Sequence, residues 1–161
     1  MAAEPTTHPS TQKVVEAARQ RGLAIEVRHF PEGTRTAQEA AHAVGASLGQ
    51  IAKSMVFLAD GKPVLVLTSG PNRVDTTKVA QHLGAARVRR ATADEVRAAT
   101  GFAIGGVPPF GHSRPLAVLF DRDLLQFETI WAAGGTPNAV FAIEPQRLAD
   151  ASGAVVADVR E

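Results

Sequence analysis

A β-hairpin in the first half of the chain is the feature that most restricts its fold. Residues 52–59 read AKSMVFLA, residues 62–70 read KPVLVLTSG, and Asp60-Gly61 separates the two runs. Both runs are rich in residues that favour strands, and Asp-Gly is a preferred sequence for a two-residue hairpin turn. Because strands joined in this way are antiparallel, the hairpin excludes a purely parallel sheet.

Helical and extended segments alternate around this hairpin. Ser, Thr or Asp capping residues and terminating glycines predict helices over residues 10–21, 36–45, 75–83 and 92–101, and Pro145 begins a short helix that ends near Gly153. Further strands are expected over residues 23–29, 115–121, 127–133, 138–144 and 154–159. The length of 161 residues favours one domain. We therefore predict a flexible tail over residues 1–9 and a single α/β domain of the α+β type over residues 10–161, built on a mixed, largely antiparallel sheet.

Composition excludes several classes of protein. The chain has no cysteine, which rules out disulfides, thiolate chemistry and cysteine-based zinc sites. With 17 basic and 16 acidic residues the net charge is only +1, so contacts with nucleic acid should be short, although Arg87, Arg89 and Arg90 form a candidate basic patch. No apolar run approaches the ~20 residues of a membrane helix, and the start, MAAEPTTHPS, lacks the regions of a signal peptide. A cytoplasmic protein with no membrane partner is expected.

Several apparent motifs fail on their context. Residues 45–49 match the letters of a nucleophile elbow, but that motif lies between a strand and a helix, whereas here a helix precedes. Ser47 stands three residues before Gln50 and predicts a capping box instead. The five histidines show no metal-ligand spacing, so neither a metal nor a cofactor is expected. Asp121 and Asp123 most simply end a strand and cap a turn.

Two features keep both a structural and a functional interpretation. Residues 101–112, GFAIGGVPPFGH, combine four glycines and two prolines with apolar residues. Composition alone favours a tight buried turn, but glycine lets backbone N–H groups approach a ligand and proline fixes the chain, which also suits a row of donors for an oxyanion. Lys53 enters an apolar strand, where it either extends its charge into water or holds a phosphate. Nothing local decides between these alternatives.

Three segments together resemble a known family. IAKSMVF, TGFAIGGVPPFGH and FETIWAAGGTPNAVF, in this order and spacing, resemble the YbaK family of aminoacyl-tRNA editing domains, which are also inserted in or associated with prolyl-tRNA synthetase. The resemblance covers the chain from about Lys13 to Val159. It implies a mixed, curled sheet surrounded by helices. It also implies hydrolysis of the ester that joins a wrong amino acid to the 3′ end of a tRNA.

The resemblance also implies roles for individual residues. Lys53 corresponds to the family's essential lysine, held near the phosphate of the terminal nucleotide, and Ser54 is the adjacent polar position. Gly106 begins the family's glycine-to-proline loop, whose amides would hold the ester carbonyl oxygen, so an added Cβ there should obstruct the ester. Lys53 and Gly106 are thus the expected catalytic residues. The remaining loop residues expected to bind substrate are Gly105, Val107, Pro108 and Pro109.

Other positions concern the amino acid that is removed. Phe30 and Thr36 fall where the family lines its substrate cleft, and the position of Thr36 is aromatic in cysteine-releasing members. Ala133, before Gly134, falls where those members carry serine. Asn138 falls near a position where some alanine-releasing members carry histidine. These departures leave the reaction intact and the identity of the amino acid open.

The absence of cysteine, a serine triad or a metal cluster suggests that water, or a vicinal ribose hydroxyl acting through it, attacks the ester. The expected partners are the acceptor end of an aminoacyl-tRNA and, as a second candidate, an aminoacyl-tRNA synthetase. Two alternatives to a free-standing deacylase stay open at this point. One is an inactive tRNA- or synthetase-binding module with the same fold. The other is a regulator that uses the cleft for a different small ligand.

Overall fold

The computed structural model describes residues 8–30 and 36–161. Residues 1–7 of the expected tail lie outside the described residues. The first helix, α1 (Pro9–Gln20), begins one residue earlier than predicted, because the ring of His8 rather than Ser10 caps it: the Ser10 N–H donates to His8 Nδ1 at 3.0 Å. Pro9 suits this place, since the first turn of a helix needs no N–H from it.

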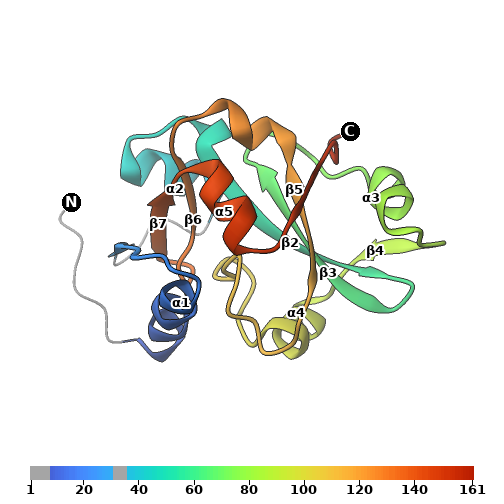
Figure 1. The fold of residues 1–161 in the computed structure, drawn as a ribbon, viewed down its shortest axis with the longest axis horizontal. Coiled ribbons are helices and arrows are strands. Elements are labelled where there is room, and N and C mark those ends of the chain that lie inside the picture. Colours follow the sequence, from blue (N-terminus) through green and yellow to red (C-terminus); the bar gives the residue numbers. More distant parts are fainter. Residues whose placement is uncertain (1–7, 31–35) are drawn as a thin grey trace.

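The described strands form one eight-stranded sheet, in the order β1-β7-β6-β2-β3-β5-β8 with β4 paired to β2 (Figure 1). The predicted hairpin is present, and Asp60 (φ 49°) and Gly61 (φ 82°) adopt the two positive φ angles of its turn. The pairs β1–β7, β6–β7, β2–β3 and β2–β4 are antiparallel, and β2–β6, β3–β5 and β5–β8 are parallel. The predicted mixed, largely antiparallel sheet is therefore confirmed. The strands are β1 (Val27–His29), β2 (Ile51–Ala59), β3 (Lys62–Ser69), β4 (Val88–Arg90), β5 (Ala117–Asp121), β6 (Ile130–Ala133), β7 (Ala139–Ile143) and β8 (Val155–Ala157).

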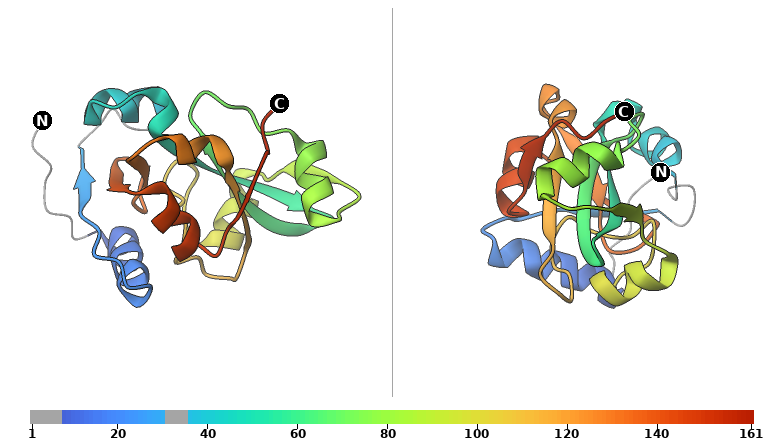
Figure 2. Two further views of the ribbon diagram at one scale, coloured as in Figure 1. Left: turned by 45° about the horizontal axis from the view of Figure 1, so that its top comes forward. Right: turned by 90° about the vertical axis from the view of Figure 1, so that its right-hand side faces the viewer.

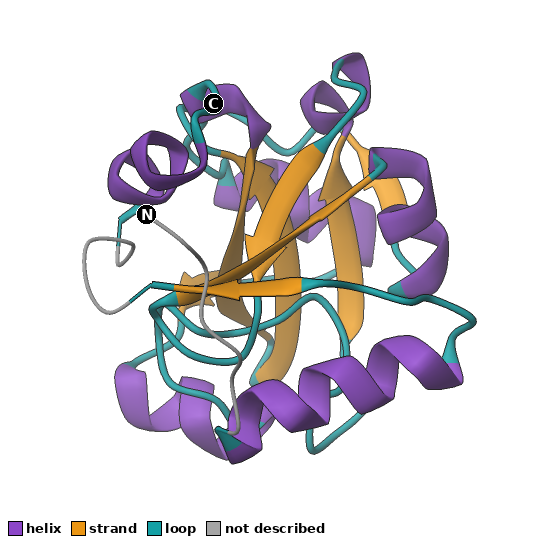
Figure 3. Ribbon diagram, turned by 90° about the vertical axis from the view of Figure 1, so that its left-hand side faces the viewer, coloured by secondary structure: helices purple, strands orange, loops and turns teal. Residues whose placement is uncertain are grey.

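Helices surround the sheet (Figure 3). Helices α1 and α2 lie toward one end of the molecule, with β7, and α3 lies beside β4 at the other (Figures 1 and 2). The main core lies between sheet and helices and includes fully buried Leu65, Leu67, Phe120 and Phe141. No described helix is long and apolar enough to cross a membrane. The remaining helical elements are α2 (Ala37–Val44), η1 (Leu48–Gln50), α3 (Thr76–Leu83), α4 (Ala93–Thr100), η2 (Arg122–Gln126) and α5 (Pro145–Ala151).

Local capping signals place the helices well. Thr36, Asp75 and Thr92 cap α2, α3 and α4, and each of these helices ends at a glycine in the left-handed conformation. Ser47 forms the predicted capping box with Gln50 at the start of η1, which removes the nucleophile-elbow interpretation. Asp121 caps η2, as its sequence context indicated.

Strand boundaries are less accurate. The strand predicted over 23–29 is confined to β1, and the one predicted over 127–133 begins only at Ile130. Strand β4 was not predicted, because Arg89 and Arg90 are exposed and only three residues pair with β2. Of the three arginines in the candidate basic patch, Arg89 donates two hydrogen bonds to Glu95, with N–O distances of 2.8 and 2.9 Å, so its charge is paired.

One edge of β2 is interrupted, and this interruption positions the site. On that edge, Ile51 and Ala52 pair with β6, and residues 57–59 pair with β4. Between these two pairings, residues 53–55 have no strand partner on that side within the described part of the chain. The sheet therefore opens at the segment that holds Lys53 and Ser54.

Candidate active site

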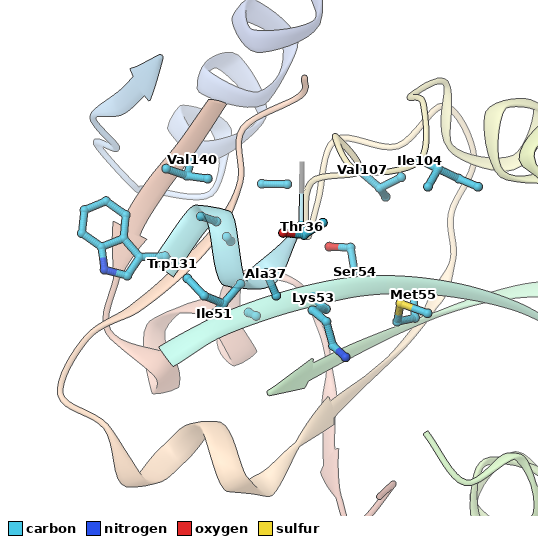
Figure 4. Close-up of a pocket in the computed structure, with 15 residues that line it drawn as sticks. Thr36, Ala37, Ile51, Lys53, Ser54, Met55, Ile104, Val107, Trp131 and Val140 are labelled. Atoms are coloured by element: carbon cyan, nitrogen blue, oxygen red, sulfur yellow. The ribbon is translucent and has the colours of Figure 1, made fainter. Parts of the chain in front are cut away.

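A pocket of about 260 Å³ lies at this opening (Figure 4). Its walls come from five parts of the chain: the start of α2, strand β2, the glycine-rich loop, β6 and β7. They are predominantly apolar, with small side chains from several alanines. Six residues that the sequence analysis expected to be functional line this pocket: Thr36, Lys53, Ser54, Gly105, Val107 and Ala133. The other lining residues are Ala37, Ala40, Ile51, Ala52, Met55, Ile104, Trp131, Ala132 and Val140.

Ser54 supplies the unpaired polar atom of this pocket. Its Oγ is buried and has no hydrogen-bond partner within the described residues. The other hydroxyl of the lining, that of Thr36, is already used, since it accepts from the Glu39 N–H at 3.1 Å and donates to Glu39 Oε1 at 3.0 Å. A buried hydroxyl without a partner is costly and needs a partner from water or a ligand. Ser54 is thus poised to contact whatever fills the pocket.

The amino group of Lys53 lies on the other side of β2. Successive side chains of a strand point to opposite faces, and Figure 4 shows the Lys53 nitrogen directed away from Ser54 and Thr36. Its Nζ donates to the carbonyl oxygen of Asn72 at 2.9 Å. A second pocket, of about 280 Å³, opens there, with Asn72, Arg73 and Arg90 among its walls, and Lys53 reaches both pockets.

Three cationic residues and one acidic residue, Glu161, line this second pocket. Burial lowers the pKa of Lys53, the positive charges of Arg90 and Arg73 lower it further, and the carboxylate of Asp121 opposes them. Neither Arg73 nor Arg90 forms an ion pair within the described residues. Three cationic groups near one another gain from a bound anion, which relieves their mutual repulsion.

The glycine-rich loop is partly a wall of the pocket and partly packed structure. Ile104, Gly105 and Val107 line the pocket, and the side chain of Ile104 is 56% exposed. Gly106 and the two prolines that follow Val107 are buried and do not line it. The structural interpretation therefore describes Gly106 and the two prolines, whereas Ile104, Gly105 and Val107 stand where the functional interpretation needs them.

The position of Gly106 differs from the expectation in two respects. Its N–H already donates to the carbonyl of Ala103 at 3.0 Å, so it is not free to hold a substrate. A Cβ built at Gly106 would lie 2.8 Å from the backbone carbonyl carbon and Cα of Thr136, so it would meet the chain rather than an ester. By contrast, the N–H groups of Gly105 and Val107 donate no hydrogen bond within residues 8–30 and 36–161. Both residues line the pocket.

The remaining predicted residues support the pocket from behind. Phe30 is 3% exposed and packs with Ile51, Trp131 and Val140, which form part of the lining. The Phe30 N–H donates to the Asn138 carbonyl at 2.8 Å. Gly134 belongs to the turn between β6 and β7, where its N–H donates to the Ala139 carbonyl at 2.7 Å. None of these three lines the pocket.

A family model described as the aminoacyl-tRNA editing domain matches residues 31–151. This chain belongs to the aminoacyl-tRNA editing domain family. The chain is 34% identical over 128 residues to the uncharacterized protein YwhH of Bacillus subtilis (strain 168). The match covers 79% of this chain and 81% of YwhH. The chain is 37% identical over 97 residues to the proline–tRNA ligase of Limosilactobacillus fermentum. That match covers 57% of this chain but only 17% of the ligase.

Solved structures resemble the editing domain along nearly its whole length. One, described as a proposed trans-editing enzyme for prolyl tRNA synthetase, superposes with a TM-score of 0.92 at 48% identity and covers 97% of this chain and 99% of its own. Another, the hypothetical protein APE2540, gives a TM-score of 0.86 at 36% identity over 92% of this chain and 99% of its own. The predicted family and fold are therefore confirmed.

Sequence reasoning missed the apolar walls of this editing domain. Trp131 lines the pocket, and the guanidinium carbon of Arg28 lies 4.9 Å from its ring centroid. Trp131 stands inside one of the three family-like segments and is the only tryptophan of the chain, which is the signal that could have singled it out. Ile51 and Val140 carry no such signal, because their contribution depends on strand pairing.

Other candidate groups of the editing domain stand apart from the pocket. His112 Nε2 donates to the Pro108 carbonyl at 2.7 Å, and burial lowers the pKa of His112. It does not line the pocket. Within the described residues, no three His, Asp or Glu side chains are grouped so that they could hold a metal.

Proposed function

We propose that this editing domain is a free-standing trans-editing deacylase that hydrolyses the ester of a mischarged small amino acid on tRNA. The observation that carries this proposal is the pair of pockets on the two sides of the open β2 edge. One is apolar with an unpaired hydroxyl, and the other is cationic. The aminoacylated 3′ end of a tRNA also has an apolar part and an anionic part. The small amino-acid side chain lies on one side of the ester, and the phosphate of the terminal nucleotide lies on the other.

The apolar pocket takes the aminoacyl group. Alanines from α2, β2 and β6 line it, together with Trp131. Its lining contains no acidic residue, so the α-ammonium of the substrate has no carboxylate partner there and Ser54 Oγ is the acceptor within reach. Ala133 and Thr36 stand where cysteine-releasing relatives are expected to carry serine and an aromatic residue. A small side chain is therefore preferred, without dependence on a thiol.

The cationic pocket takes the phosphate of the terminal nucleotide. Lys53 acts there as a point charge, with Arg73 and Arg90 beside it. Because the net charge of the chain is only +1, these local cations rather than a broad basic surface attract the tRNA. Binding should involve few phosphates, with a slope of log affinity against log salt of roughly −2 to −4.

The reaction follows from the groups that are present. The free N–H groups of Gly105 and Val107 hold the ester carbonyl oxygen as it becomes an oxyanion, and each such donor contributes about 10²–10³ in rate. Water, or a ribose hydroxyl acting through it, attacks the carbonyl carbon. The bond from that carbon to the ribose oxygen breaks, the ribose oxygen takes a proton, and the free amino acid and the tRNA hydroxyl are released.

The relatives suggest which tRNA is the substrate. Proline–tRNA ligases contain a region that matches this chain, and the structural neighbour is described as acting for prolyl tRNA synthetase. We therefore propose that the substrate of this domain is tRNA for proline that carries the wrong amino acid. The deacylase domain would comprise residues 10–161, and the reaction would take place in the cytoplasm. A proline–tRNA ligase is the synthetase partner that fits.

A deacylation panel tests the proposal. The parent protein is incubated with tRNAs charged with alanine, serine, threonine, cysteine or proline, and release of the amino acid is followed. We expect hydrolysis of alanyl or seryl esters and a strong loss with Lys53→Ala. Hydrolysis of cysteinyl-tRNA alone would overturn the proposed pocket preference. If the parent binds these tRNAs but hydrolyses none, the domain is a binding module.

A further inference from the structure

A buried carboxylate lies beneath the cationic pocket, and the mechanism above does not use it. Asp121 is 1% exposed at the end of β5. Its Oδ2 accepts from Thr68 Oγ1 at 3.1 Å, from the Ser69 N–H at 3.0 Å and from Asn72 Nδ2 at 2.8 Å, and its Oδ1 accepts from the Asp123 N–H at 2.9 Å. No Lys or Arg pairs with it among the ion pairs of the described residues. A buried charge held by four neutral donors fixes those donors in place.

Asn72 connects this carboxylate to Lys53. Its Nδ2 donates to Asp121 Oδ2 and to Asp123 Oδ2, each at 2.8 Å, and Arg160 holds Asp123 from the other side at 3.0 Å. The Asn72 N–H donates to the Ser69 carbonyl at 2.9 Å and closes the turn after β3. With its side chain and its N–H both engaged, the carbonyl of Asn72 has a fixed direction. That carbonyl accepts the hydrogen bond from Lys53 Nζ at 2.9 Å.

We propose that Asn72 and Asp121 are positioning residues, which hold the Lys53 ammonium at the mouth of the cationic pocket through the Asn72 carbonyl. The step from positioning to activity rests on the proposed function, since it assumes that Lys53 contacts the substrate phosphate. The positioning itself does not depend on it. Without this acceptor the flexible four-carbon side chain of Lys53 is free to sample many rotamers, and this freedom weakens its contact with a phosphate.

The charges around Lys53 agree with this arrangement. Arg73 and Arg90 face it from the turn after β3 and from β4, Asp121 lies beneath it at the end of β5, and Glu161 lines the same pocket. Both arginines lower the pKa of Lys53 and Asp121 raises it. If the Asn72 carbonyl turns away, Lys53 loses a hydrogen bond that favours the charged amine, so the pKa of Lys53 should fall further.

The network could instead serve only to join β3, β5 and the turn between β3 and α3. Thr68→Val is the matched control, because it removes one hydrogen bond to the same Asp121 carboxylate and leaves Asn72 in place. Asn72→Ala removes the two side-chain bonds that orient the carbonyl. Similar thermal melting of the two variants would show that they are equally well folded.

The test combines a double-mutant cycle with a direct measurement on Lys53. Single-turnover deacylation is measured for the parent, Asn72→Ala, Thr68→Val, Lys53→Ala and the Lys53→Ala/Asn72→Ala double variant. We expect Asn72→Ala to lose about ten- to a hundredfold in kcat/KM, the ordinary contribution of a hydrogen bond to a charged group, and Thr68→Val less than about threefold. The double variant should match Lys53→Ala alone, because Asn72 acts only through Lys53.

NMR titration of the Lys53 side-chain amine gives a readout that needs no activity. Its pKa should fall in Asn72→Ala and stay at the parent value in Thr68→Val. The positioning role is overturned if the pKa is unchanged in Asn72→Ala, or if Asn72→Ala slows the Lys53→Ala protein by the same factor as the parent. If the parent deacylates nothing, the proposed function fails while the titration still decides the positioning.

Discussion

Substitution of Gly106 by alanine separates the packed part of the glycine-rich loop from its catalytic part. The φ of Gly106 is not among the positive ones, so alanine brings no left-handed strain. Its Cβ would nevertheless lie 2.8 Å from two backbone atoms of Thr136 and 3.0 Å from its nitrogen. Because backbone atoms cannot rotate away as a side-chain end can, the loop itself must move.

The size of the stability loss in Gly106→Ala follows from that steric clash. Overpacking of this kind typically costs about 1–3 kcal/mol, and each kcal/mol lowers Tm by about 2–4 °C for a chain of this length. The displaced residues include Gly105 and Val107, which line the pocket and whose N–H groups are the proposed donors. Movement of both donors should reduce deacylation by at least about 10²-fold, the usual effect of losing one such donor.

Gly153→Ala is the matched control for stability. Gly153 has a φ of 67°, and no described atom apart from its chain neighbours lies within 4 Å of a Cβ built there. Alanine at this position costs roughly 1–2 kcal/mol through left-handed strain alone. It stands in the turn between α5 and β8, away from both pockets.

The assay pairs thermal melting by circular dichroism with single-turnover deacylation. We expect both variants to melt a few degrees below the parent, with a rate loss only in Gly106→Ala. If Gly106→Ala melts lower but deacylates as fast as the parent, the loop does not hold the ester. If Gly153→Ala loses as much activity, the loss reflects stability and the reasoning is refuted.

Three further predictions concern single side chains. Lys53→Ala should abolish most deacylation and reduce the salt slope of tRNA binding by about 0.7–0.9 for one lost phosphate contact; an unchanged slope in filter binding would contradict this. Ser54→Ala should slow deacylation without lowering Tm, since it removes a buried hydroxyl that has no partner among the described residues; a clear fall in Tm would show that the hydroxyl is bonded. Because burial lowers the pKa of His112 below its ordinary value of 6.5, its contribution to stability is complete above pH 6.5 and is lost as the pH falls below it. His112→Gln should remove that part of the pH dependence of Tm and leave deacylation at neutral pH nearly unchanged, whereas an identical pH profile of Tm would refute the assignment.

Interactions between near neighbours in the chain were readable from the sequence. The Asp60-Gly61 turn, the capping residues Thr36 and Thr92 and the capping box at Ser47 each depend on a few adjacent residues, and all are present. The three family-like segments identified the family, and the resemblance singled out Lys53 and Ser54 as candidate site residues. Alternation along β2 already implied that these two side chains point to opposite faces.

Tertiary structure alone decided what each of those faces meets. The opening at residues 53–55 exists because β6 and β4 pair with different ends of β2. The sequence of β2 does not show where these two pairings end. What a Cβ at Gly106 would meet depends on Thr136, thirty residues away. The Asn72 carbonyl accepts from Lys53 while the Asn72 side chain donates to Asp121, which belongs to another strand. Such contacts join segments that are distant in sequence, and their geometry is set by packing of the whole sheet rather than by local preference.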